Sequence, residues 1–209
     1  MTRALLLTVL AGYVAGSLPF GLWLGRALRG VDVRTLGSGN LGATNVYRTL
    51  GPAVGVPTLV LDVLKGALPV LLLPRLAFTR DFPGGAEWCA IAAGIAAVLG
   101  HVFTFLAGFR GGKGVATSVG VMLGLAPAAF AVFLATFVAA VAITRFISVG
   151  STLGALAFAV AVAVTRGVRT PTFVLACALA VVIIARHRDN YRRLRRGEER
   201  RFSFGRERA

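Results

Sequence analysis

Residues 37–48, GSGNLGATNVYR, combine residue types that bind phosphate and open with Gly-x-Gly-x-x-Gly. Glycines allow the backbone to turn several N–H groups toward one anion, and a helix that begins directly after them favours negative charge at its N-terminus. Arg48 adds a planar cation that suits phosphate. The stretch therefore predicts an anion-binding loop; the plainer alternative is a turn that only connects two helices. Its candidate residues are Ser38, Gly39, Asn40, Gly42, Thr44, Asn45 and Arg48.

A second glycine-rich stretch, residues 100–118, reads GHVFTFLAGFRGGKGVATS. A nucleotide-binding P-loop requires Ser or Thr after its lysine, but Gly114 follows Lys113. Glycines on both sides of a lysine, just before a new apolar segment, still predict an anion-binding loop with Lys113 as its charge. The glycines of this loop are Gly111, Gly112 and Gly114. For His101, a hydrogen-bonded packing role and a catalytic role are equally good interpretations.

Two further pairs of polar residues are spaced three apart, so each pair shares one face of a helix. Ser148 and Ser151 lie in RFISVGSTLGA, and His187 and Asn190 lie in ARHRDN. Taken alone, the serines fit helix caps and the histidine fits a partner of a helix dipole.

Asp62 and Lys65, in LDVLKG, lie within a long apolar run and can neutralise each other. Charges inside a membrane are costly and usually face the protein interior or a functional cavity. We favour a structural pair near the site over a direct catalytic role.

The elements that must position these residues are apolar. The chain has 209 residues, of which 56% are hydrophobic, and its mean hydropathy is +0.79. A membrane-spanning helix needs about 20 mostly apolar residues. The sequence therefore predicts an all-α integral membrane protein with seven transmembrane helices, near residues 4–25, 53–74, 88–107, 114–126, 128–145, 150–165 and 171–186. The first could pass for a signal peptide, but its apolar run continues to Gly25 and we expect it to be retained.

The fourth and fifth segments form one apolar run that is interrupted only at Ala126-Pro127. The run is too long for one crossing of a hydrocarbon core about 30 Å thick. Two short spans also place seventeen of the 23 basic residues on one face, which is then the cytoplasmic face. We expect the N-terminus outside and the C-terminus in the cytoplasm.

We divide the chain into a transmembrane domain, residues 1–187, and a basic cytoplasmic tail, residues 188–209. The chain has a net charge of +15, and nine of its 23 basic residues lie in this tail, where arginines can set topology and bind anionic lipid headgroups. We therefore expect membrane lipids, and no nucleic acid, as partners of the tail.

All four polar motifs fall on the predicted cytoplasmic face. A dinucleotide site is excluded, because it would require a preceding strand and a βαβ unit. His, Cys and acidic residues do not cluster with metal-ligand spacing, so we expect no metal site. Phosphoryl transfer normally needs Mg²⁺ held by acidic residues, and the cytoplasmic loops before the tail offer only Asp32. Acyl transfer from an activated donor fits better, because orientation and charge stabilisation can supply most of the rate.

The stretches GSGNLGATNVYRTLG, GHVFTFLAGFRGGKGVATS, SVGSTLGA and RHRDN together resemble the bacterial acyl-phosphate:glycerol-3-phosphate acyltransferases of the PlsY type, over nearly the whole chain. The resemblance implies a multi-pass enzyme of the bacterial plasma (inner) membrane with its active site on the cytoplasmic side. Its reaction would move a fatty acyl group from acyl phosphate to the 1-hydroxyl of sn-glycerol 3-phosphate. The products would be lysophosphatidic acid and phosphate, in the first step of phospholipid synthesis. The resemblance implies no metal or organic cofactor, and we expect a monomer.

Carried onto this sequence, the resemblance assigns catalytic roles to Ser38, Arg48, Lys113 and His187, and substrate binding to the glycines and polar residues of the motifs. Our hypothesis is that Arg48 and Lys113 hold phosphate. Ser38 would orient the donor. One of the two serines of the third motif, Ser148 or Ser151, would position glycerol 3-phosphate together with His187 and Asn190. No protein base is evident, and His187 as the base is the alternative.

Two other functions fit the sequence less well than the enzyme does. A transporter or channel for a phosphorylated metabolite would need anion-binding groups on both sides, but the outward segments PRLAFTRDFPGGAEW and TRGVRTP lack matching glycine-rich donors. A noncatalytic membrane subunit that binds partners through its basic tail would leave Lys113 and its glycines without a role.

Overall fold

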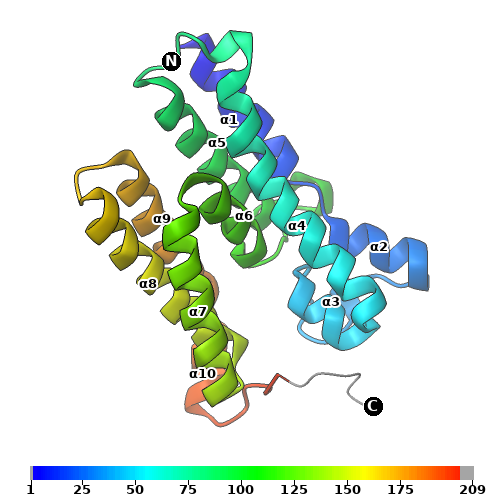
Figure 1. Cartoon of the computed structure of the whole chain (residues 1–209). Helices are drawn as coiled ribbons and strands as arrows, with labels where there is room; N and C mark the ends of the chain where they lie inside the picture. Colours follow the sequence, from blue (N-terminus) through cyan, green and yellow to red (C-terminus); the bar gives the residue numbers. More distant parts are fainter. Residues whose placement is uncertain (1, 203–209) are drawn as a thin grey trace. The chain divides into compact units, whose positions relative to one another are not determined.

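The structure is a computed structural model that describes residues 2–202, and every regular element in that range is helical (Figure 1). This confirms the predicted all-α class. The chain divides after Gly124 into two compact units, and each unit is described by itself. Residues 203–209 of the predicted tail, with Arg206 and Arg208, lie outside the described residues.

The first unit is built from long apolar helices and two short amphipathic ones. Its helices are α1 (Arg3–Gly16), α2 (Phe20–Arg29), α3 (Ala43–Leu50), α4 (Pro52–Leu72), α5 (Gly85–Val102) and α6 (Val115–Leu125). Single 3-10 turns lie between them at η1 (Val33–Thr35), η2 (Leu73–Arg75), η3 (Ala77–Thr79) and η4 (Phe105–Ala107). The helices α2 and α3 bury apolar side chains in one cluster with α4, which includes Leu22, Val33, Leu41, Val46, Leu50 and Val54.

Glycines allow the long helices of the first unit to approach each other closely. α1 and α5 lie side by side (Figure 1). A Cβ atom on Gly16 of α1 would lie 1.9 Å from the carbonyl oxygen of Ala97 on α5. α4 and α6 meet in the same way, because a Cβ atom on Gly120 would lie 1.9 Å from the carbonyl oxygen of Val63. Substitution at either glycine would therefore push a helix backbone away.

The predicted first apolar segment, residues 4–25, is broken in its C-terminal half. α1 ends at Gly16, and Pro19, which has no N–H, stands just before α2. Side chains of other segments bond the backbone here: Thr104 Oγ1 donates to the Ser17 carbonyl at 2.5 Å. Ser17 Oγ in turn donates to the Gly100 carbonyl at 3.3 Å. The break therefore ties the end of α5 to the junction between α1 and α2.

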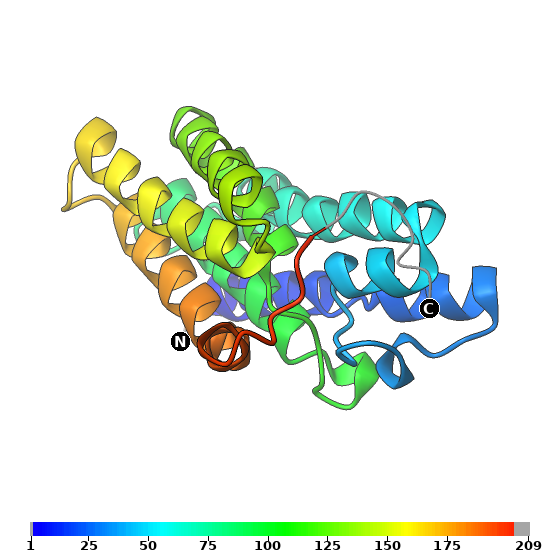
Figure 2. The same cartoon turned by 90° about the horizontal axis from the view of Figure 1, so that it is seen from below.

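The second unit contains α7 (Pro127–Thr144), α8 (Ile147–Arg166), α9 (Pro171–Arg186) and the short helix α10 (Arg188–Arg195). α7 and α8 lie side by side in both views (Figure 2). The turn between them needs a left-handed residue, and Arg145 adopts φ +62° there. α10 is bent by 50° from α9, and His187 stands at the bend.

The structure supports a helical membrane protein but not the full count of spans. Five helical segments of the described residues are long and apolar enough to cross a membrane, and α9 with α10 makes a sixth if the bent pair is one span. The predicted separation at Ala126-Pro127 is confirmed, since α6 ends at Leu125 and α7 begins at Pro127. However, α6 is only 11 residues and about 16 Å long. Seven crossings and the orientation of the termini therefore stay predictions.

Candidate active site

The first glycine loop, residues 37–42, is held together by Asn45 of α3. The Asn45 side-chain oxygen accepts the N–H of Ser38 at 3.0 Å, and its amide nitrogen donates to the carbonyls of Leu36 at 3.1 Å and Asn40 at 3.0 Å. Gly37 lies so close that a Cβ atom there would be 2.5 Å from the Asn45 side-chain oxygen. The Asn45 amide thus shapes the loop from within.

The helix expected after this loop is present. α3 begins at Ala43 with Gly42 as its N-cap, and Asn40 Oδ1 accepts the N–H of Gly42 at 2.8 Å. Thr44 and Arg48 stand four residues apart and so share one face of α3, where both are partly buried. Ser38 is exposed and Gly39 adopts φ +69°. The first motif therefore places a hydroxyl and backbone groups just before the start of α3, and Arg48 in the last turn of that helix.

The second glycine loop, residues 108–114, folds back onto the end of α5. The N–H of Gly111 donates to the Val102 carbonyl at 3.1 Å, and the N–H of Gly112 donates to the His101 carbonyl at 3.1 Å. A Cβ atom on Gly111 would lie 1.9 Å from the His101 carbonyl oxygen, so this return requires glycine. Gly114 adopts φ +82° and α6 begins at the next residue. Lys113 is partly buried directly before that helix start, as the sequence predicted.

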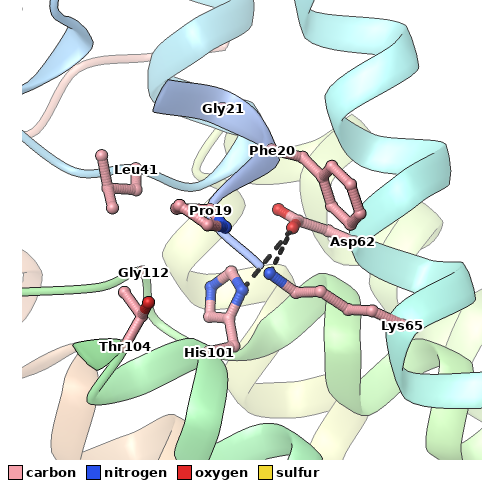
Figure 3. A pocket seen from close by; sticks show the side chains of 9 residues that line it. All are labelled: Pro19, Phe20, Gly21, Leu41, Asp62, Lys65, His101, Thr104 and Gly112. Atoms are coloured by element: carbon pink, nitrogen blue, oxygen red, sulfur yellow. Dashed lines mark ion pairs between the residues drawn. The ribbon is translucent and has the colours of Figure 1, made fainter. Parts of the chain in front are cut away.

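The two loops of the first unit meet at one small pocket (Figure 3). Leu41 of the first loop and Gly112 of the second both line it. The remaining lining residues are Pro19, Phe20, Gly21, Asp62, Lys65, His101 and Thr104. The cavity volume is about 10 Å³, which is enough for about one water molecule. The fold therefore brings together two sequence motifs that are about 70 residues apart.

In the second unit, the third and fourth motifs are joined by a glutamate. Glu199 Oε1 accepts from Ser148 Oγ at 3.1 Å and from Asn190 Nδ2 at 2.5 Å, and Glu199 Oε2 accepts from Arg193 Nε at 2.8 Å. We call these residues the Glu199 network. Ser151 is different, because its hydroxyl donates to the Ile147 carbonyl of its own helix at 2.9 Å. Of the two serines, Ser148 is thus the one bonded to the fourth motif.

The helix-cap interpretation of these serines is wrong. The N-cap of α8 is Phe146, and no side chain bonds the free N–H groups at that cap. Ser148 and Ser151 lie inside α8 and are buried.

His187 is buried at the bend between α9 and α10. Its Nδ1 lies 2.7 Å from the Ile183 carbonyl, which can only accept a hydrogen bond, so Nδ1 carries the proton. In the neutral imidazole Nε2 is then an acceptor. This tautomer suits an imidazole that accepts a hydrogen bond from a substrate hydroxyl.

Glu199 is a site residue that could not be recognised from the sequence. Its side chain is 6% exposed although the surrounding tail is rich in arginine. The only sign of it in the sequence is an acidic residue, within GEER, in a tail that is otherwise rich in arginine. That signal was weak because the partner Ser148 is 51 residues away.

Asp32, in the loop before η1, forms ion pairs with two arginines. Its carboxylate lies 2.6 Å from Arg34 Nη2 and 2.8 Å from Arg26 Nη2. Hydrogen bonds from Arg34, with a further one from Arg26, hold the pKa of Asp32 well below its ordinary value. Among residues 2–202, no three His, Cys, Asp or Glu side chains gather in a way that would hold a metal ion.

Comparison with known proteins gives one consistent result. The family model described as glycerol-3-phosphate acyltransferase matches residues 6–197. A protein of Geobacter sulfurreducens named glycerol-3-phosphate acyltransferase is 50% identical over 203 residues, covering 97% of this chain and 99% of the relative.

Solved structures agree with this result. The crystal structure of PlsY (YgiH), an integral membrane glycerol 3-phosphate acyltransferase, in its glycerol 3-phosphate form has a TM-score of 0.85 and 36% identity, and covers 95% of this chain and 96% of that one. The lysophosphatidic acid form has a TM-score of 0.83 and 35% identity, with 96% of each chain covered. The resemblance found from the motifs is thus confirmed. This chain belongs to the glycerol-3-phosphate acyltransferase family.

Proposed function

We propose that this protein transfers a fatty acyl group from acyl phosphate to the 1-hydroxyl of sn-glycerol 3-phosphate and releases lysophosphatidic acid and inorganic phosphate. Family membership favours an acyltransferase of glycerol 3-phosphate over a transporter. The solved PlsY structures in glycerol 3-phosphate and lysophosphatidic acid forms support the acceptor and the product. The identity of the acyl donor is the finer part of the proposal.

The meeting of two glycine-rich loops at one pocket is the observation that carries the donor proposal. One loop leads into the helix of Arg48 and the other leads to Lys113. The two cations, Arg48 after the first loop and Lys113 in the second, match a reaction in which both substrates carry a phosphate group. An acyl-CoA or a carrier-protein thioester would not place a phosphate next to the reacting carbonyl.

In the proposed reaction the 1-hydroxyl oxygen of glycerol 3-phosphate attacks the carbonyl carbon of acyl phosphate. The tetrahedral oxyanion then collapses, the bond between the carbonyl carbon and the phosphate oxygen breaks, and phosphate leaves. Arg48 and Lys113 would hold phosphate, while Ser38 and backbone N–H groups of Gly39 and Gly42 would orient the donor. Phosphate departs as an anion, so the leaving group needs no proton from the protein.

Residues of the second unit would bind the acceptor. We assign Ser148, His187 and Asn190 to glycerol 3-phosphate, and we prefer Ser148 to Ser151 because Ser148 shares Glu199 with Asn190. His187 Nε2 can accept the hydrogen bond of the attacking hydroxyl. The proton then passes to a substrate phosphate or to water, and His187 as the base remains the alternative.

The proposal includes the setting of the enzyme. We place it in the bacterial inner membrane as a monomer with seven crossings, an outside N-terminus and a cytoplasmic active site. Residues 1–187 would form the membrane domain. The basic tail, residues 188–209, would contact anionic lipid headgroups.

Phosphate release from the purified protein tests the function. Palmitoyl phosphate and glycerol 3-phosphate are supplied together or singly, palmitoyl-CoA serves as a parallel donor, and Lys113→Ala is measured alongside. We expect release that needs both substrates, no thiol release from the CoA donor, and loss of activity in the variant. Arg80→Ala removes an exposed cation elsewhere and should retain activity. Equal use of palmitoyl-CoA, or full activity of Lys113→Ala, would overturn the proposal.

A further inference from the structure

A buried charge cluster lies next to the second glycine loop and has no part in the proposed chemistry. It consists of Asp62 and Lys65 on α4 and His101 near the end of α5, with residue exposures of 1%, 5% and 4%. Ionisable residues at such positions in membrane proteins are expensive and usually serve function. The cluster therefore needs an explanation beyond packing.

The Lys65 ammonium group contacts a carboxylate, a backbone carbonyl and an aromatic ring. Its Nζ lies 2.7 Å from Asp62 Oδ1 and donates to the Leu18 carbonyl at 2.7 Å. It also stands 5.6 Å from the centre of the Phe20 ring. The Leu18 carbonyl is left outside α1 at the break before α2. Lys65 thus neutralises Asp62 and bonds a backbone group at the break.

Asp62 faces His101 across the pocket (Figure 3). Asp62 Oδ1 lies 3.7 Å from His101 Nδ1. The second carboxylate oxygen, Oδ2, is buried and makes no hydrogen bond within the described residues. The Asp62 carboxylate therefore forms an ion pair with Lys65 and lies next to the imidazole of His101.

The far edge of the same imidazole lies against the second glycine loop. A Cβ atom on Gly112 would stand 2.0 Å from His101 Nε2, and the His101 carbonyl accepts the Gly112 N–H at 3.1 Å. Lys113 is the next residue. His101 is thus in contact with the carboxylate through one ring edge and with the turn before Lys113 through the other.

From this geometry we infer that Asp62 is a positioning residue that acts through His101 to hold the turn at Gly111 and Gly112, and so places Lys113. The inference rests on the proposed role of Lys113 in binding phosphate. The pocket beside the ring has room for about one water molecule, which gives the imidazole space to move when its carboxylate partner is removed. A moved ring would release the Gly112 backbone and displace the lysine.

The test variants must separate positioning from folding. Asp62→Asn alone would leave the Lys65 ammonium buried without a carboxylate, which is strongly destabilising. Asp62→Asn combined with Lys65→Met removes both charges and keeps the side-chain volumes similar. His101→Ala removes the ring. Thr58→Val is the matched control, because Thr58 is also buried on α4 but its hydroxyl bonds the Val54 carbonyl of its own helix at 2.8 Å.

The first measurement reports on Lys113 directly and does not depend on activity. The chain has two lysines, and the side chain of Lys65 is only 4% exposed. A water-soluble amine-acylating reagent followed by peptide mass spectrometry therefore measures the modification rate of Lys113. We expect this rate to change severalfold in the charge-free double variant and in His101→Ala, but not in Thr58→Val. An unchanged rate in both test variants would overturn the inference.

The second measurement uses the reaction. Lys113→Arg keeps the positive charge but shifts its position. The substrate whose KM rises in this variant is the one that depends on the position of the cation. In phosphate release, the KM for that substrate should rise about tenfold or more in the double variant and in His101→Ala. The effect should be smaller than multiplicative when His101→Ala is combined with Lys113→Arg. A purely structural role would instead lower kcat through the folded fraction, leave KM unchanged and multiply with Lys113→Arg, which would refute the inference.

The two proposals fail in different ways. A wild-type protein that releases no phosphate from the two substrates contradicts the proposed function, whatever the modification rates are. A wild-type protein that is active, with KM and Lys113 modification unchanged in both test variants, contradicts the positioning role alone.

Discussion

Glu199 illustrates how much a single carboxylate organises in this protein. It accepts hydrogen bonds from Ser148, Asn190 and Arg193 and is 6% exposed. Removing it leaves a partly buried guanidinium and two polar groups without their acceptor. We expect Glu199→Ala to lower the free energy of unfolding by about 2–4 kcal/mol, measured by thermal unfolding of the purified protein in detergent. Glu198→Ala, at the exposed neighbouring glutamate, is the control. Equal destabilisation by the two variants would contradict this role.

Asp32 gives the protein a predictable response to acid. Its pKa is lowered in the folded state by hydrogen bonds from Arg34 and Arg26. A lowered pKa means that the stabilisation is present above the unfolded-state pKa, about 4, and is lost as the pH falls toward the lower folded-state pKa. We therefore expect Asp32→Asn to be less stable than the wild type at pH 7, with the difference shrinking below about pH 4. Unfolding midpoints from pH 7 to pH 3 measure it. A difference that grows in acid would show that the carboxylate is not stabilised by these arginines.

Among the elements, the crossing of α4 and α6 depends on glycine. A Cβ atom on Gly120 would lie 1.9 Å from the Val63 carbonyl oxygen, which belongs to a helix backbone and cannot move alone. A Cβ atom on Gly124 of the same helix would meet the end of the Val70 side chain at 2.6 Å, which can rotate. We expect Gly120→Ala to destabilise the protein by about 1–3 kcal/mol and Gly124→Ala by less. Thermal unfolding of the two variants compares them, and the reverse order would refute this packing.

The long helices could be located from the sequence because their apolar runs are long, and Pro127 marked the start of one of them. The sequence predicted the separation before Pro127 and the helix start after Gly42, since both depend on local chemistry. It did not predict the break at Pro19, where the hydropathy is continuous and the freed backbone is bonded by side chains distant in the chain. Glu199 was missed for the same reason.

The site residues follow the same distinction. Glycine, lysine and arginine in the two loops indicated anion binding by their type and spacing alone. The placement of Asp62 against His101 joins residues 39 positions apart on different helices, and no local pattern encodes that contact. Residue type and spacing therefore predict candidate substrate contacts, but they do not predict the contacts that hold the two loops in place.

At the scale of the whole molecule, the surface is what a lipid environment requires. Large apolar side chains on the long helices are exposed, up to 83% at Ile143 and 80% at Val164. Such exposure is unfavourable in water and neutral against lipid tails. The relatives that match the chain are bacterial and the similar solved structures are integral membrane proteins. The orientation of the chain in the membrane is the property that places the active site on one side.

Cysteine labelling tests that orientation and whether α6, although short, counts as a crossing. In a background with Cys89→Ala and Cys177→Ala, single cysteines are introduced at the exposed positions Asp81, Phe109 and Val168. With seven crossings and the N-terminus outside, a membrane-impermeant maleimide should label the cysteines at 81 and 168 in intact cells and the one at 109 only in opened membranes. If α6 spans the membrane, four crossings separate positions 81 and 168, which then lie on the same side. If α6 does not span, three crossings separate them and they lie on opposite sides. Labelling of 81 without 168 would therefore remove α6 from the spans, and labelling of 109 in intact cells would move the second glycine loop, with Lys113, to the outside.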